Sequence, residues 1–191
     1  IKVASIPKER MQVYFIDNDE YFKRKAIFSD EDDQLFSDND ERAIFFAKGV
    51  VETVKKLNWA PDIIHVHGWM ASLLPLYIKE YYSDEPLFSE SKIVTSVYDK
   101  DFEGSLNGGL AEKIKFDKIS DDKISILQEP NYTNIIKSAV SNSDAIVQGS
   151  SEIPEEIAEE IRNREVPALS FQEEDSFESY LNFYKELISE E

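Results

Sequence analysis

The chain has two histidines, His65 and His67, which one residue separates at the end of a predicted strand. Alternate residues of a strand point to the same face, so both imidazoles are expected on one face of a sheet. Two imidazoles can ligate a metal ion, but a site needs further ligands, and the sequence has no third histidine and no cysteine. No carboxylate stands at a supporting spacing. We therefore expect no metal here, and we expect His65 to join a hydrogen-bond network on the core side.

Other polar and aromatic side chains follow the ends of two predicted strands. His67, Gly68 and Trp69 come after one strand, and Tyr98 and Asp99 come after the next one. Ligand sites in open α/β sheets lie beyond the carboxyl ends of the strands, and a helix beginning after the first of these ends would offer free amide groups. The two strand ends are therefore the predicted site. Trp69 is open to two interpretations, a platform for a sugar ring or a packing residue.

Strands alternate with helices over the last two-thirds of the chain, and short loops separate them. The pattern predicts strands at 1–6, 12–16, 62–66, 92–97, 144–148 and 166–171. It predicts helices at 41–57, 70–82, 110–115, 131–140, 153–164 and 176–188, with Pro75 kinking the second helix or standing near its start. Residues 19–40 and 99–129 have no sustained period. The order implies βαβ crossovers, and hence an α/β fold with a doubly wound, Rossmann-like parallel sheet in a single domain, 1–191.

Composition narrows the class of protein. The 191 residues are 41% hydrophobic and carry a net charge of −18. A surface this acidic repels phosphate backbones and anionic lipids, so we expect no nucleic-acid or membrane partner. No apolar run is long enough to span a bilayer and no signal peptide opens the chain, which favours a cytoplasmic protein. Because the first residue is Ile1 and already belongs to a predicted strand, we also expect that residues preceding it are missing.

Several weaker patterns have plain structural interpretations. Arg42, near the start of a predicted helix, is expected to be a buried ion-pair partner for acidic residues of the preceding loop. Gly108-Gly109 lacks the lysine and hydroxyl of a phosphate-binding loop, and Gly149-Ser150-Ser151 does not form the elbow of a serine hydrolase. Residues 151–191 have a net charge of −10, which favours solvated helix faces over an acidic docking tail.

Three motifs follow one another in a specific order. They are Asp38-Asn39-Asp40-Glu41-Arg42, then Trp59-Ala60-Pro61-Asp62, then His65-Val66-His67-Gly68-Trp69. Together they resemble the N-terminal domain of bacterial glycogen synthases and plant starch synthases, in which a "DN, two residues, R" element precedes WxPD and an HxHDW strand end. The resemblance covers residues 10–99 well and resumes weakly at 135–160.

The resemblance implies a fold and a reaction. The family has the GT-B fold, in which two Rossmann-like domains face each other across a cleft. It transfers glucose from ADP-glucose to the non-reducing end of an α-1,4-glucan. The N-terminal domain mainly shapes the acceptor side, and the C-terminal domain holds most of the nucleotide sugar. No cofactor is implied, and ADP-glucose is the expected co-substrate.

The chain departs from the family pattern at the site itself. Gly68 replaces the aspartate of HxHDW, and Tyr98 and Asp99 replace the histidine and asparagine of a TIHN strand end. Phe28 stands where the family has a tyrosine in an "R, two residues, IY" loop. A carboxylate at Asp99 has the wrong sign for a departing diphosphate. The resemblance implies an upstream Lys-x-Gly-Gly loop and a C-terminal GT-B domain, and we expect this protein to lack both, as short single-domain homologues do.

Three functions remain open at this point. The first is a domain that keeps a glucan- or sugar-binding face without efficient catalysis. The second is a half-synthase that transfers glucose only with a partner chain, and the third is a regulatory or protein-interaction module with a decayed site. The substrate-binding residues expected for the first are His67, Trp69, Tyr98, Asp99, Phe28 and Arg42. The expected partner is an α-glucan or a small sugar, with a protein partner as a possibility.

Overall fold

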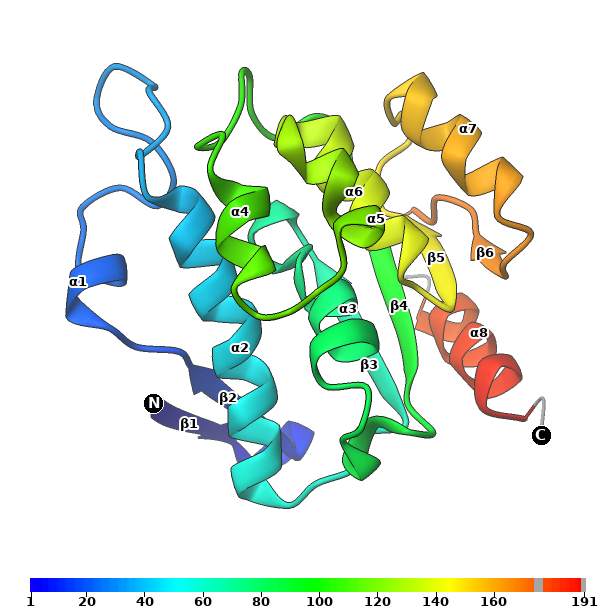
Figure 1. Cartoon of the computed structure of the whole chain (residues 1–191). Helices are drawn as coiled ribbons and strands as arrows, with labels where there is room; N and C mark the ends of the chain where they lie inside the picture. Colours follow the sequence, from blue (N-terminus) through cyan, green and yellow to red (C-terminus); the bar gives the residue numbers. More distant parts are fainter. Residues whose placement is uncertain (174–176, 190–191) are drawn as a thin grey trace.

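Helices and strands alternate along the chain as the sequence predicts, in a computed structural model that describes residues 1–173 and 177–189 (Figure 1). The strands are β1 (Lys2–Ile6), β2 (Met11–Phe15), β3 (Ile63–His67), β4 (Lys92–Val97), β5 (Ala145–Gln148) and β6 (Ala168–Leu169). The helices are α1 (Asp19–Phe22), α2 (Asn39–Leu57), α3 (Leu74–Leu76), α4 (Leu110–Lys115), α5 (Asp121–Ile124), α6 (Tyr132–Ser141), α7 (Glu155–Asn163) and α8 (Phe177–Ser189).

A parallel sheet in the order β3-β4-β5-β6 carries the fold. Its register pairs His67 with Ser96 and Val97 with Gln148, so β3, β4 and β5 finish at the same edge. The two N-terminal strands form a separate antiparallel hairpin. The predicted α/β, Rossmann-like parallel sheet is therefore confirmed.

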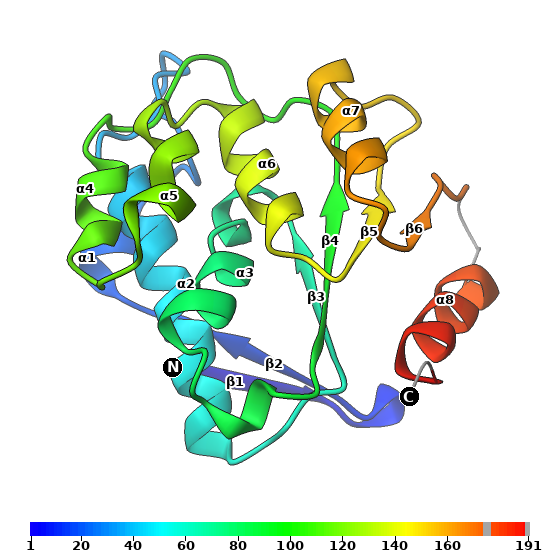
Figure 2. The same ribbon diagram turned by 45° about the vertical axis from the view of Figure 1, so that its right-hand side comes forward.

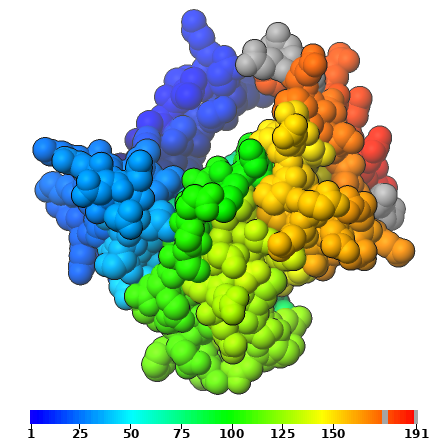
Figure 3. Space-filling view, turned by 90° about the horizontal axis from the view of Figure 1, so that it is seen from above, coloured from blue at the N-terminus to red at the C-terminus, as the bar shows by residue number. Residues whose placement is uncertain are grey.

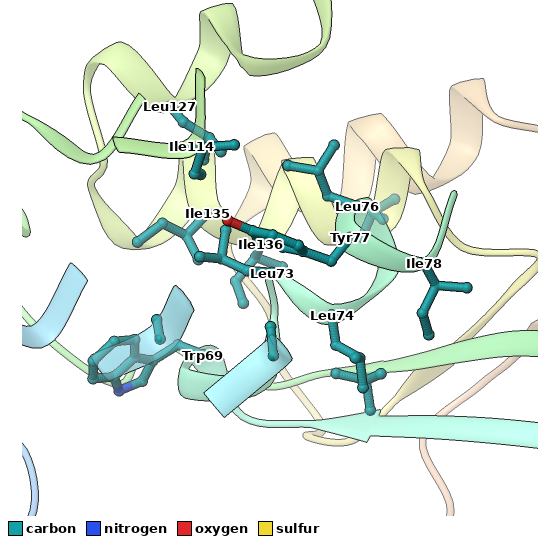
Figure 4. Close-up of a cluster of buried hydrophobic side chains, with 14 of the residues drawn as sticks. Trp69, Leu73, Leu74, Leu76, Tyr77, Ile78, Ile114, Leu127, Ile135 and Ile136 are labelled. Carbon is teal, nitrogen blue, oxygen red and sulfur yellow. The ribbon is translucent and has the colours of Figure 1, made fainter. Parts of the chain in front are cut away.

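Helices cover both faces of this sheet (Figure 2). On one face, the crossover helices and α2 enclose the main core, part of which Figure 4 shows. Its largest buried side chains include Trp69, Leu73, Leu76, Tyr77, Ile135 and Ile136. On the other face, α8 packs against the strands through a smaller cluster formed by Val94, Ala145, Val147, Phe183 and Leu187. Because side chains alternate along a strand, His65, His67 and Ser96 lie on the α8 face.

The predicted helix 70–82 is wrong as a continuous helix. A 3₁₀ turn at Trp69–Ala71 comes first, then the three residues of α3, then a π-turn at Tyr77–Tyr81. Pro75 stands in the first turn of α3, which is one of the two placements expected for it and needs no N–H there. The Tyr82 amide donates to the Tyr77 carbonyl at 2.9 Å, five residues back. The element that begins at the end of β3 is therefore a short 3₁₀ turn and not the long helix that was expected.

The last predicted strand is also shorter than expected, since β6 has two residues. Pro167 precedes it and cannot donate a ladder hydrogen bond, although its carbonyl accepts from the Ile146 amide at 3.0 Å. The edge of the sheet is therefore short.

Loops gather at the edge where the parallel strands finish. The segments after α1, β4 and β5 rise at this end of the molecule (Figure 1). Seen from this end, the surface is hollowed between the blue N-terminal segment and the yellow-to-orange C-terminal elements (Figure 3).

Candidate functional site

His67 and Tyr98 form a hydrogen-bonded pair at the ends of β3 and β4. The Tyr98 hydroxyl lies 2.7 Å from Nδ1 of His67, and the two ring centroids are 6.2 Å apart. His67 is exposed and Tyr98 is half-buried, so both rings can be reached from solvent. The structure thus brings together two of the residues that the strand ends predicted.

His65 lies beneath this pair. Its Nε2 is 2.8 Å from Ser96 Oγ, and its Nδ1 is 2.5 Å from the Tyr184 hydroxyl of α8. The centroids of the two imidazole rings are 4.0 Å apart, with 36° between their planes. The expected network around His65 and the shared face of the two histidines are confirmed.

Both imidazoles are uncharged near neutral pH. Burial and the neighbouring His67 lower the pKa of His65 to about 4, and partial burial also lowers the pKa of His67. Each neutral ring has one nitrogen that donates and one that accepts. The pair therefore presents hydrogen-bonding groups without positive charge.

The low pKa of His65 predicts a pH dependence of folding stability. The unfolded state binds a proton below about pH 6.5 and the folded state only near pH 4, so stability is expected to fall as pH drops through this window. His65→Gln removes this contribution. Urea unfolding of both proteins between about pH 7 and pH 5 measures it, and the variant is expected to show the shallower slope. Equal slopes for the two proteins would contradict the lowered pKa of His65. The carboxylates, which also bind protons as the pH falls, are the same in both proteins and cannot produce a difference.

The Tyr98 ring packs directly on the backbone at the end of β5. A Cβ atom built on Gly149 would stand 2.8 Å from Tyr98 Cδ1 and 2.9 Å from Cζ. The Gly149 amide donates to the Val97 carbonyl at 2.7 Å, and Ser150 Oγ accepts from the Asp99 amide at 3.2 Å. Only glycine at this position leaves room for the tyrosine.

Asp99 adds negative charge beside the pair. It is exposed, and its Oδ1 accepts from the Lys100 amide at 2.7 Å, while Lys100 Nζ pairs with Glu103 at 2.6 Å. Desolvation and the charge of Asp99 raise the pKa of Asp101. This end of the sheet is therefore anionic, and it can accept hydrogen bonds from hydroxyl groups.

Trp69 does not offer its ring to solvent. It is 2% exposed, and its ring packs between Phe28 at 4.8 Å and Phe102 at 5.1 Å between centroids. The 3₁₀ turn after β3 directs it into the main core (Figure 4). This core and the α8 cluster lie on opposite faces of the sheet. The interpretation of Trp69 as a stacking platform is wrong, and the packing interpretation holds. Phe28 is half-buried and belongs to the same aromatic group.

Tyr132 connects this aromatic group to the site. Its ring meets Phe102 edge-on at 5.6 Å, and its hydroxyl donates to the carbonyls of Tyr98 and Asp99 at 3.2 and 2.9 Å. These two hydrogen bonds hold the residues that follow β4 in place.

Arg42 is 3% exposed near the start of α2. It donates to Asn39 Oδ1 at 2.6 Å, and its guanidinium stands over the rings of Phe22 and Phe36. No carboxylate among residues 1–173 and 177–189 is within ion-pair distance of it, so the expected ion pair is wrong. The loop carboxylate of Asp38 pairs with Arg24 instead.

Gly68 adopts a backbone conformation that side chains exclude. Its φ of 73° and ψ of 157° lie in a region that is essentially restricted to glycine. A β-carbon at this position would meet no neighbouring atom within 4 Å. The obstacle to an aspartate here is therefore the backbone and not a lack of space.

The sequence missed several residues of the site. Gly149 and Ser150 follow β5, a third strand end that the strand-end rule covers, so this signal was available. No sequence signal indicated Tyr184, because α8 lies next to β3 only in the folded chain. Across the part of the chain that the structure describes, no group of three His, Asp or Glu side chains could hold a metal ion, and no helix is long and apolar enough to cross a membrane.

Two hollows lie away from the strand ends. One of about 610 Å³ is lined by the hairpin and by Leu57 and Trp59 after α2. Another of about 650 Å³ is lined by residues of α1, α2 and α4, where Lys48 and Lys113 are already paired with Asp117 and Glu41. Neither includes the His67–Tyr98 pair.

Comparison with known proteins matches this architecture. The sequence model of the family described as "Starch synthase catalytic domain" matches residues 1–169. A glycogen synthase of Chlorobium luteolum is 34% identical over 176 residues, covering 91% of this chain and 34% of its own length. That of Chlorobaculum tepidum is 31% identical over 174 residues, covering 90% and 33%. That of Chlorobium chlorochromatii is 39% identical over 103 residues, covering 51% and 20%.

The fold and the site define a Rossmann-like α/β domain with its polar groups at the carboxyl ends of parallel strands, consistent with the N-terminal half of a GT-B glycosyltransferase. The match over residues 1–169 is specific. The chain belongs to the starch synthase catalytic domain family, which includes glycogen synthases, and the resemblance noted in the sequence is confirmed. The chain spans about a third of the length of these curated relatives.

Proposed function

We propose that this chain binds the non-reducing end of an α-glucan at the His67–Tyr98–Asp99 edge, as a glycogen-synthase-like domain that does not transfer glucose efficiently by itself. The observation that carries the proposal is the exposed His67–Tyr98 hydrogen bond at the ends of β3 and β4. It supplies a half-buried aromatic ring with polar groups around it. Such a combination suits a pyranose ring and its hydroxyls.

The charge of this edge favours the glucan, which accepts glucose, over the nucleotide sugar, which donates it. Neutral imidazoles and the carboxylates of Asp99 and Asp101 do not attract a diphosphate. A neutral glucan has no charge for these carboxylates to repel. We therefore propose that the glucan binds at this edge and that ADP-glucose binds to groups outside it. The proposed setting is the cytoplasm.

Affinity electrophoresis through gels containing glycogen tests the proposal. The unmodified chain is expected to be retarded, and Tyr98→Phe and Asp99→Asn are each expected to weaken binding about fivefold, since one net hydrogen bond contributes about 1 kcal/mol. Tyr81→Phe is the matched control, because Tyr81 lies in the π-turn on the other face of the sheet. Unretarded, folded protein would remove the glucan assignment and favour a protein-interaction role for the acidic surface.

Transfer in the presence of a second chain is the alternative activity. The chain spans about a third of the length of its relatives, and in this alternative a second chain supplies the other groups that a synthase needs. Incorporation of glucose from ADP-glucose by a mixture of chains, and by neither chain alone, would support this half-synthase.

A further inference from the structure

Helix α8 contributes a side chain to the site from outside the matched region. The family match ends at residue 169, and α8 begins at Phe177. Through Phe183 and Leu187, α8 is anchored on the face of the sheet that carries both histidines. Hydrophobic contacts with the sheet therefore hold α8 next to the site.

Tyr184 reaches from α8 to His65. Its hydroxyl lies 2.5 Å from His65 Nδ1, and the two rings meet edge-on with centroids 5.7 Å apart. The other ring nitrogen of His65 is engaged by Ser96 Oγ at 2.8 Å. With both nitrogens engaged, the ring of His65 has a single orientation.

That orientation is transmitted to the exposed pair by contact. The His65 ring lies against the His67 ring at 4.0 Å, and His67 in turn holds the Tyr98 hydroxyl at 2.7 Å. In a neutral imidazole one nitrogen donates and the other accepts. The hydroxyls of Tyr184 and Ser96 therefore take opposite roles, one accepting from the ring of His65 and the other donating to it.

We propose that Tyr184 is a positioning residue, which holds His67 and Tyr98 through the ring of His65 in the orientation that the sugar face uses. The inference deepens the proposed function and rests on it only for ligand binding. The orientation of the imidazoles themselves is independent of any ligand. Helix α8 thus adds a support to the site that the family-matched part of the chain does not contain.

Imidazole NMR of the full chain tests this directly, because only two histidines contribute signals. Tyr184→Phe keeps the ring and removes the hydroxyl. It is expected to shift the ring resonances of both His65 and His67, with the tautomer signature of His65 changed. Tyr81→Phe, in the π-turn on the other face of the sheet, is the control that removes a tyrosine hydroxyl, and it is expected to leave both tautomers unchanged. A shift confined to His65 would overturn the proposal, since His67 would then be positioned without Tyr184.

Maltoheptaose binding supplies the second readout. Tyr184→Phe is expected to weaken it about fivefold, as loss of one hydrogen bond does, while Tyr81→Phe leaves it unchanged. Full affinity in Tyr184→Phe would contradict the positioning role. If the unmodified chain fails to bind maltoheptaose, the proposed function fails by itself, and the NMR comparison still decides the role of Tyr184.

Discussion

Replacing Gly149 with alanine is expected to displace the Tyr98 ring and to destabilise the fold by about 1–3 kcal/mol, the usual cost of forcing an extra carbon into a packed contact. The new Cβ would stand under 3 Å from three atoms of the ring. Because the same backbone amide bonds the Val97 carbonyl, the strand cannot move away to relieve the contact without losing a ladder bond. Urea unfolding measures the change in free energy, and the NMR signals of His67 report the displaced ring.

Gly108→Ala is the matched control for this experiment. A Cβ built on Gly108 meets nothing within 4 Å, and its φ is not positive. We expect a change within about 0.5 kcal/mol for this variant. Equal losses in the two variants would show that the effect at Gly149 comes from glycine flexibility and not from contact with Tyr98.

Trp69→Ala is expected to produce the largest loss of stability, about 3–5 kcal/mol, since it empties a fully buried aromatic position. The Trp69 side chain is 2% exposed between Phe28 and Phe102. Removal leaves a cavity beneath the residues that carry Tyr98. Chemical denaturation at neutral pH gives the change in free energy.

Trp59→Ala provides the comparison, because the second tryptophan of the chain is 57% exposed. It is expected to cost under about 1 kcal/mol. A small loss in Trp69→Ala, comparable to that of Trp59→Ala, would contradict the packing role. Any loss of glycogen retardation in Trp69→Ala has to be compared with its folded fraction, since Trp69 does not reach the ligand side.

Local pattern was sufficient to predict the elements with strong periodicity. The apolar spacing from Ala43 to Leu57 predicted α2, and the β-branched run of β4 was predicted with the bounds that the structure has. In each case hydrophobic burial and local propensity favour the same conformation. The break at Leu74–Leu76 was harder to foresee, because helical and π hydrogen bonding use the same apolar spacing and only packing selects between them.

The site was predictable where it depends on topology and unpredictable where it depends on side-chain direction. Parallel strand ends share an edge, and this brought His67 and Tyr98 together. Trp69 follows the same strand end, but one 3₁₀ turn sends it to the opposite face. Tyr184 is 119 residues from its partner His65, and nothing in the helical period of α8 indicates which strand it meets.

The backbone at Gly68 also limits how this chain can change. Reintroducing the aspartate of the HxHDW pattern by one substitution would place a side chain at φ 73° and ψ 157°, with strain of about 1–3 kcal/mol. A carboxylate at this position therefore requires a different backbone conformation of the turn in addition to the substitution itself. One substitution is thus insufficient, because the main chain and not the neighbouring side chains sets the restriction.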